Sequence, residues 1–342
     1  MTSMERFSQL AAGKIPDRVP VICNLLDQGA ALLGMSIKEY YSKGKNVARG
    51  QLLLQEKFGY DSLDALFYVG LEAEVLGANI IFSEYGYPNV GKPIVKDYED
   101  IESLTIPGSL ESNPRFSELL ECVRILKKES MGRVPVACAV TASFSLPSIL
   151  MGIEKWLPFF LEERYGMEKL LEKCSQYCVK QFKALKNAGA DFVLYTNPIA
   201  STTFINRYQF RKLALPWVKR DIEAISDPST IYFSGGGTIV PLIGDIMSET
   251  GLTSFYLCPD DSISEAKKLV NGRGIVIGAY NDIQLLNGSP ESIDNQVKEI
   301  MEAGKPGGGF AFATLMMPLK IPEANIRAML NAAFRYGDYA GD

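Results

Sequence analysis

Eight short runs of apolar residues recur along the chain, and longer amphipathic stretches separate most of them. Each run is apolar almost throughout, without the strict alternation that marks a strand with one solvent-exposed face. This pattern is typical of parallel strands that are covered on both faces. The runs span residues 19–24, 62–69, 134–140, 191–196, 230–234, 253–258, 274–280 and 309–314.

The stretches between these runs have the periodicity and the end signals of helices. Ser262 and Ser289 are good N-caps for two of them. The main predicted helices cover residues 114–128, 167–187, 208–225, 239–250, 262–270, 290–303 and 322–334.

Eight strand–helix units in succession predict an α/β fold, a (β/α)8 TIM-type barrel that forms a single domain over residues 1–342. A doubly wound sheet is the alternative. A helix over residues 4–12 is expected to pack beside or beneath the barrel. Residues 71–97 break the rhythm, and we expect them to form a short insertion over the barrel mouth.

Composition narrows the function classes. The net charge is −5 with both signs interspersed, so the chain lacks the basic footprint of a nucleic-acid-binding protein. No apolar run reaches the length of a membrane span, so no membrane partner is expected. The six cysteines include no CxxC pair and are typical of reduced thiols, which favours a cytoplasmic location.

The chain contains no histidine. A general base must therefore be a carboxylate, a Tyr, a Cys or a Lys. A histidine-bound metal and a Ser-His-Asp triad are both excluded.

In a barrel of this type the chemistry gathers at the C-terminal ends of the strands. The polar side chains expected there are rich in Tyr and small polar groups and poor in Lys and Arg, which favours a neutral or cationic ligand. A strand-end Tyr is equally compatible with a half-buried structural role. The candidates are Asn24, Tyr68, Glu72, Glu74, Tyr195, Asn197, Ser201, Tyr232, Ser234, Cys258, Asp260, Tyr280, Asn281 and Met316.

A run of three glycines, Gly235–Gly237, follows the fifth apolar run. It is compatible with a tight turn before a helix and with an anion-binding nest at the helix N-terminus. The glycines alone leave both interpretations open.

Several motifs, in order along the chain, resemble the uroporphyrinogen decarboxylase superfamily, and most closely its corrinoid-dependent methyltransferases, such as the methylcobamide:coenzyme M methyltransferases. The family fold is a (β/α)8 barrel, and the resemblance covers almost the whole chain. The motifs are PDRVPV (16–21), EAEVLGA (72–78), IASTTFINRYQF (199–210), LPWVK (215–219), SEAKKLV (264–270), IGAYND (277–282) and the stretch 307–329.

The resemblance also implies the position of a zinc site, but the residues of this chain at that position differ from the zinc ligands of the family. In the thiol-methylating enzymes, His-x-Cys-Gly ends the fifth strand, and a further Cys follows the last strand. The matching positions here are Tyr232, Ser234 and Leu315. Zinc is therefore not expected, and no metal ligands are assigned.

The decarboxylases of the superfamily carry an arginine-rich segment after the first strand, which holds the substrate carboxylates. The corresponding residues here, 24–33, include no basic residue. An essential Asp of those enzymes falls near Tyr68. A porphyrinogen-like substrate is therefore disfavoured.

The resemblance implies a methyltransferase that moves a methyl group between a small substrate and the cobalt of a corrinoid (cobalamin) carried by a separate protein. For a methyl ether, Tyr232, Cys258, Asp260 and Tyr195 are the candidate acids. For a methylamine, the tyrosines with Glu72 or Glu74 are candidates to hold the cation. The alternatives are a non-catalytic ligand-binding or assembly partner in a methyltransfer system, and a decarboxylase acting on a porphyrinogen-like substrate.

Overall fold

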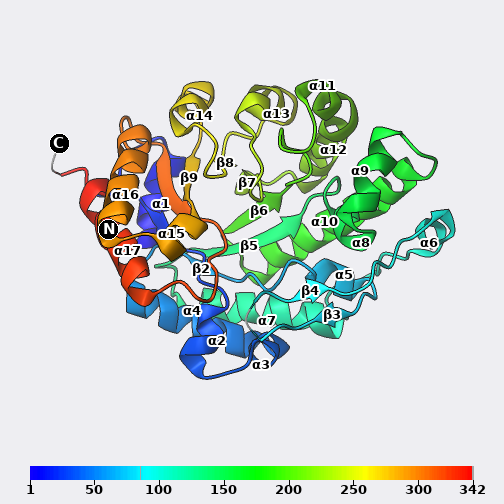
Figure 1. Ribbon diagram of the computed structural model, residues 1–342, viewed down its shortest axis with the longest axis horizontal. Coiled ribbons are helices and arrows are strands. Elements are labelled where there is room, and N and C mark those ends of the chain that lie inside the picture. Colours follow the sequence, from blue (N-terminus) through cyan, green and yellow to red (C-terminus); the bar gives the residue numbers. More distant parts are fainter. Residues whose placement is uncertain (85, 341–342) are drawn as a thin grey trace.

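The computed structural model describes every residue of the chain except 85, 341 and 342. Eight parallel strands form one curved sheet surrounded by helices (Figure 1). Each strand coincides with one of the eight apolar runs, and only β5 extends past its run, by one residue, within the described part of the chain, which confirms the predicted fold class. The strands are β1 (Val21–Ile22), β2 (Leu63–Asp64), β5 (Val136–Thr141), β6 (Phe192–Thr196), β7 (Thr230–Phe233), β8 (Phe255–Tyr256), β9 (Val276–Tyr280) and β10 (Phe310–Thr314).

The strand order is β1-β10-β9-β8-β7-β6-β5-β2, so β1 and β2 stand at the two ends. One backbone hydrogen bond links these ends, from the Asp61 N–H to the Val21 carbonyl at 2.7 Å. The Asp61 carboxylate in turn accepts the Val21 N–H at 2.8 Å and pairs with Arg6 and Arg18. The curvature and this link favour a barrel over a doubly wound sheet, and they explain why Arg18 stands in the PDRVPV motif.

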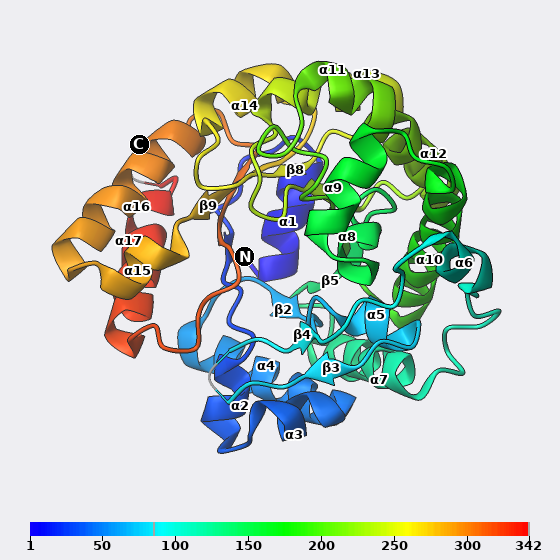
Figure 2. The same ribbon diagram turned by 45° about the vertical axis from the view of Figure 1, so that its right-hand side comes forward.

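Helices surround the strands in an outer ring, apart from α1, which lies across the middle of that ring (Figure 2). They are α1 (Ser3–Ala11), α2 (Gln28–Leu33), α3 (Ile37–Ser42), α4 (Gly44–Phe58), α5 (Leu71–Val75), α6 (Tyr98–Ser103), α7 (Pro114–Glu129), α8 (Leu146–Leu150), α9 (Ile153–Leu161), α10 (Met167–Ala188), α11 (Arg207–Gln209), α12 (Leu215–Ile225), α13 (Ile243–Thr250), α14 (Ile263–Val270), α15 (Asp282–Asn287), α16 (Pro290–Gly304) and α17 (Glu323–Gly337), with a π-helical turn η1 (Phe210–Ala214) and a 3-10 turn η2 (Val240–Leu242).

The helix predicted over residues 208–225 is divided in the structure. Residues of α11 lead into the π-helical turn η1, and α12 then begins at Leu215. Pro216 has no N–H to donate to a preceding carbonyl, so the regular hydrogen-bond ladder cannot pass through it. The proline explains the change of helix type at this point.

Helix α1 closes the N-terminal end of the barrel, and Figure 2 shows it across the middle of the helix ring. Its buried residues Phe7 and Leu10 belong to the same apolar cluster as the inward-facing residues of the strands. The Phe7 ring lies 5.2 Å from that of Phe192, at the start of β6. The opposite, C-terminal end is therefore the one left for a site.

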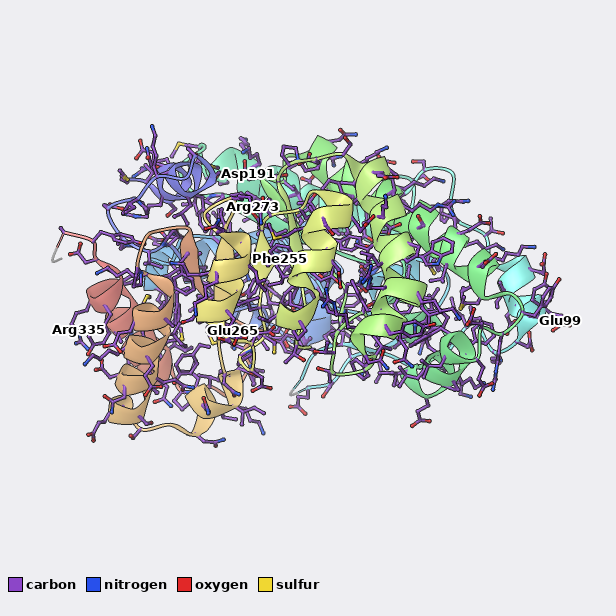
Figure 3. The ribbon with its side chains drawn as sticks, turned by 90° about the horizontal axis from the view of Figure 1, so that it is seen from above. Glu99, Asp191, Phe255, Glu265, Arg273 and Arg335 are labelled. Carbon is purple, nitrogen blue, oxygen red and sulfur yellow. The ribbon has the colours of Figure 1, made fainter. Side chains whose placement is uncertain are left out.

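Successive strand residues alternate between two apolar clusters, as the pleat of a strand requires. One cluster fills the barrel and includes Leu194, Ile231 and Tyr256. The other lies between strands and helices and includes Tyr195 and Tyr232. Figure 3 labels Phe255, a residue of β8, and Glu265, a residue of the outer helix α14.

The stretch expected to interrupt the barrel, residues 71–97, contains α5 and a short antiparallel hairpin. The hairpin pairs β3 (Ile80–Ile81) with β4 (Asn89–Val90). The Tyr87 hydroxyl, just before β4, donates to the Met317 carbonyl at 2.6 Å. This bond ties the hairpin to the loop that follows β10. Within the described residues, no helix has the length and apolar character needed to cross a membrane.

Candidate functional site

A cavity of about 120 Å³ opens at the C-terminal ends of the strands. Its walls are mostly apolar, and its residues come from β5, β6 and β7, from the segments that follow β1, β2 and β10, and from α5, α7 and α10. Four of the fourteen candidates named from the sequence line it: Asn24, Tyr68, Glu72 and Met316. The other lining residues are Leu26, Ala65, Leu66, Phe67, Val69, Leu71, Leu119, Ala139, Val140, Thr141, Gln181, Leu194, Thr196 and Phe233.

Glu72, in the first turn of α5, contributes an acidic side chain to the wall of this cavity. Its side chain is buried, and Oε1 accepts from the Thr141 hydroxyl at 3.0 Å and from Gln181 Nε2 at 3.3 Å. Burial raises the pKa of the Glu72 carboxyl, and the hydrogen bonds from Thr141 and Gln181 oppose that rise. Gln181 Oε1 and Thr196 Oγ1 find no hydrogen-bond partner within the described residues.

Tyr68, which lines the cavity, forms a pair with Glu74, which does not. The Tyr68 hydroxyl donates to Glu74, and Arg115 Nη2 donates to the same hydroxyl at 2.8 Å. Arg115 Nε also lies 3.2 Å from the Glu74 carboxylate. The Glu74 charge is thus balanced by Arg115, and Glu74 does not line the cavity. Sequence reasoning missed Arg115 because it comes from the start of α7, far along the chain from Tyr68.

Asn24, at the end of β1, is fixed by the barrel interior. Its Nδ2 donates to the Tyr256 hydroxyl at 2.8 Å and to the Thr314 carbonyl at 2.5 Å. The Tyr256 hydroxyl donates to the same carbonyl. Asp64 alternates along β2 with residues of the helix-side cluster, so it faces the interior, and burial raises its pKa to about 7. Tyr256 and Asp64 were not among the sequence candidates.

Tyr195 and Tyr232 do not face the cavity, contrary to the expectation from their strand-end positions. The Tyr195 hydroxyl donates to Asp221 Oδ2 of α12 at 2.6 Å. The Tyr232 hydroxyl lies 3.4 Å from the Ala200 carbonyl, and its ring packs against Tyr195 and Phe255. Burial raises the pKa of both phenols. Their place follows from the pleat: Phe233, one residue on, is the β7 side chain that reaches the cavity.

Cys258 and Asp260 also lie outside the cavity lining. Cys258 is buried, and burial raises the pKa of its thiol to about 11, so the thiol stays protonated at neutral pH. Asp260 is exposed. Its neighbour Asp261 is buried and accepts the backbone N–H groups of Ile239 and Val240, each at 3.0 Å. The acidic pair after β8 therefore includes one residue that anchors η2.

The remaining candidates do not line the cavity: Tyr280 ends β9, and the others lie in the loops and turns that follow strands. Asn281 caps α15 by accepting from Ile283 and Gln284 N–H. Asn197 accepts from the Ser145 hydroxyl at 2.6 Å, and Ser201 donates to the Pro198 carbonyl. Tyr280 packs against Phe312, and the Ser234 hydroxyl is buried without a partner in the described part of the chain.

The glycine run after β7 is explained by a tight turn. Gly235 and Gly236 have φ values of +61° and +101°, which disfavour other residues, and a Cβ on Gly237 would collide with Ser201. Leu315 lies 4.0 Å from the place of a Cβ on Gly236. The turn after β7 therefore approaches Leu315, the residue that follows β10.

The side chains at the zinc-ligand positions of the family do not fit zinc. Tyr232 faces the helices with a neutral phenol, Ser234 offers a hydroxyl, and Leu315 has no donor atom and packs against the barrel interior. Among the residues that the structure describes, no group of three or more His, Cys, Asp or Glu side chains is placed to hold a metal ion.

Comparison with known proteins identifies the family to which the chain belongs. A family model described as uroporphyrinogen decarboxylase (URO-D) matches residues 2–336. The chain belongs to this family. The methylcobamide:CoM methyltransferase MtbA of Methanosarcina acetivorans is 27% identical, and the match covers 98% of this chain and 98% of that protein. The uroporphyrinogen decarboxylase of Chlorobium phaeobacteroides is 28% identical over 61% of this chain and 60% of that protein.

Among solved structures, a methyltransferase from Methanosarcina mazei superimposes with a TM-score of 0.84 at 20% identity, covering 98% of this chain and 99% of the other. This likeness confirms the barrel of the uroporphyrinogen decarboxylase family. The match to MtbA confirms the resemblance to methylcobamide:CoM methyltransferases that the motifs indicated. The relatives of this chain thus include corrinoid-dependent methyltransferases matched over nearly their whole length.

Proposed function

We propose that this protein is a corrinoid-dependent methyltransferase component that moves a methyl group between a small substrate and the cobalt of a corrinoid on a separate protein. The observation that carries the proposal is the small, mainly apolar cavity at the C-terminal ends of the strands. Relatives named as methylcobamide:CoM methyltransferases, matched over nearly the whole chain, support it.

In this proposal the chain's own residues bind and orient the substrate. Reduced cobalt is itself a strong nucleophile, so the protein has mainly to hold the methyl carbon in line with it and to exclude water. The apolar walls around Leu66 and Phe67 pack against the substrate, and Glu72 fixes its polar end. Asn24, held by Tyr256, and Met316 complete the lining.

Decarboxylation of a porphyrinogen-like substrate has less support. Such a substrate carries several carboxylates, which proteins hold with arginine or lysine side chains. Among the described residues that line the cavity there is no Lys or Arg. The cavity is also small, at about 120 Å³.

The test is a methyl-transfer assay with the purified protein, a cobalamin-loaded partner protein in the reduced state, and a panel of methyl ethers and methylamines. We expect the reduced corrinoid absorbance to convert to the methylated form with at least one donor. Ala139→Leu, which extends a side chain into the cavity, should abolish the conversion, whereas Ser248→Ala on the outer helix α13 should not. Loss of carboxyl groups from a porphyrinogen, with no methyl transfer across the panel, would contradict the proposal.

A further inference from the structure

The cavity holds one acidic side chain and lacks a countercharge. Among its described lining residues, Glu72 is the only Asp or Glu, and none is Lys or Arg. The donors to Glu72 are the neutral groups of Thr141 and Gln181. Arg115, on the same side of the barrel, is engaged by Glu74 and Tyr68 instead. Because burying a carboxylate without a cation is costly, the cavity is suited to a ligand that brings the positive charge.

The other lining groups also suit a cation with alkyl substituents. The rings of Phe67, Tyr68 and Phe233 line the cavity, and aromatic faces attract cations within about 6 Å. Gln181 Oε1 and Thr196 Oγ1 have no hydrogen-bond partner among the described residues, and both residues line the cavity. Apolar walls accommodate alkyl groups on the nitrogen.

We propose that the cavity binds a small alkylammonium compound, with its positively charged nitrogen facing the Glu72 carboxylate and its alkyl groups against the apolar walls. The inference rests on the proposed function for the methyl step. In that step the C–N bond breaks and its electron pair stays on nitrogen, so the amine leaves uncharged. The methyl group passes to the reduced cobalt of the partner, which supplies the new bonding pair. A cationic leaving nitrogen needs no separate acid, and none of the four candidate acids lines the cavity.

The groups around Glu72 predict how the binding of an alkylammonium compound depends on pH. Tyr177 and Cys178 of α10 interact electrostatically with Glu72, and burial raises the pKa of both, so they stay neutral. On β5 the neighbour is Thr141, and on α5 itself Glu74 is paired with Arg115. Because burial also raises the Glu72 pKa, alkylammonium binding should become stronger as rising pH ionises Glu72.

The test compares choline with 3,3-dimethylbutan-1-ol, which has the same shape with carbon in place of the charged nitrogen. Calorimetric titration of the wild type should show at least about tenfold tighter binding of choline, a difference of about 1.4 kcal/mol. Glu72→Gln should remove that preference while affinity for the neutral alcohol stays within about twofold. Asp282→Asn, which removes a charge outside the lining, is the matched control and should bind as the wild type does.

Phe233→Leu provides a second variant if Glu72→Gln fails to fold, and it should weaken choline more than the alcohol. Equal affinity for the two compounds, no alkylammonium binding up to about 50 mM, or unchanged choline binding by Glu72→Gln would overturn the inference. Methyl transfer from neutral ethers alone would overturn it and leave the proposed function standing. Choline binding through Glu72 without methyl transfer from any donor would instead support the inference and contradict the proposed function.

Discussion

Around the C-terminal rim of the barrel, the side formed by β1, β2 and β5 leaves polar side chains facing a cavity, whereas the side formed by β7, β8 and β9 does not. On the first side Asn24 and Glu72 line the cavity. On the second side Tyr232 and Asp261 bond to loop and turn backbone, and Phe233 is the one described residue of that side that reaches the cavity. A polar residue at a strand end is thus available to a ligand only when its side chain faces the barrel interior.

The largest effect should come from Asp221, the buried acceptor for Tyr195 on the helix side of β6. Asp221→Ala would leave Tyr195 Oη, Ser175 Oγ and the Ser143 N–H without their acceptor. Because each buried unpaired group costs about 1–3 kcal/mol, we expect a loss of about 3–5 kcal/mol in unfolding free energy, measured by urea denaturation. Ser175→Ala, the control, should cost about 1 kcal/mol. If Asp221→Ala and the wild type have the same urea concentration at the midpoint of unfolding, the assignment of Tyr195 to a structural role on the helix side is wrong.

On the cavity side of the barrel, Asp64 should make the free energy of unfolding depend on pH. Burial raises the pKa of Asp64 to about 7 in the folded protein, whereas an unfolded Asp titrates near 4. Between about pH 4 and pH 7 the unfolded chain has released this proton and the folded chain still holds it, so stability falls as pH rises. The Asp64→Asn variant should not lose stability in this way. The difference between its unfolding free energy and that of the wild type should therefore rise by about 2–4 kcal/mol from pH 4 to pH 8. Parallel denaturation curves for the two proteins across this range would show that Asp64 does not titrate as described.

A smaller effect should separate Asp261 from its neighbour Asp260. Asp261 accepts the backbone N–H groups of Ile239, Val240 and Cys258, whereas Asp260 is exposed. Asp261→Asn keeps one acceptor oxygen and should cost about 1–2 kcal/mol in thermal or urea denaturation. Asp260→Asn should stay within about 0.5 kcal/mol of the wild type. Equal losses in the two variants would argue against an anchoring role for Asp261.

The sequence predicted the barrel well because each of the eight apolar runs corresponds to one strand of the sheet. It predicted the site less well because those runs are apolar almost throughout, and without alternation the inward side of a strand cannot be read. Tyr195 and Tyr232 were therefore indistinguishable from Tyr256, the tyrosine that faces the interior. Arg115 and Gln181 could not be found either, because helices distant in sequence bring them to Tyr68 and Glu72.

The most direct test of the contrast between the two sides is a side-by-side methyl-transfer assay of Glu72→Gln and Tyr232→Phe with the same alkylammonium donor and corrinoid partner. Glu72→Gln should lower kcat/KM about 10²-fold, because it removes the charge that pairs with the donor. Tyr232→Phe should stay within about twofold of the wild type, because Tyr232 does not line the cavity and its hydroxyl lies 3.4 Å from the Ala200 carbonyl on the helix side. The reverse result, with Tyr232→Phe inactive and Glu72→Gln active, would place the chemistry on the β7 side and contradict this account.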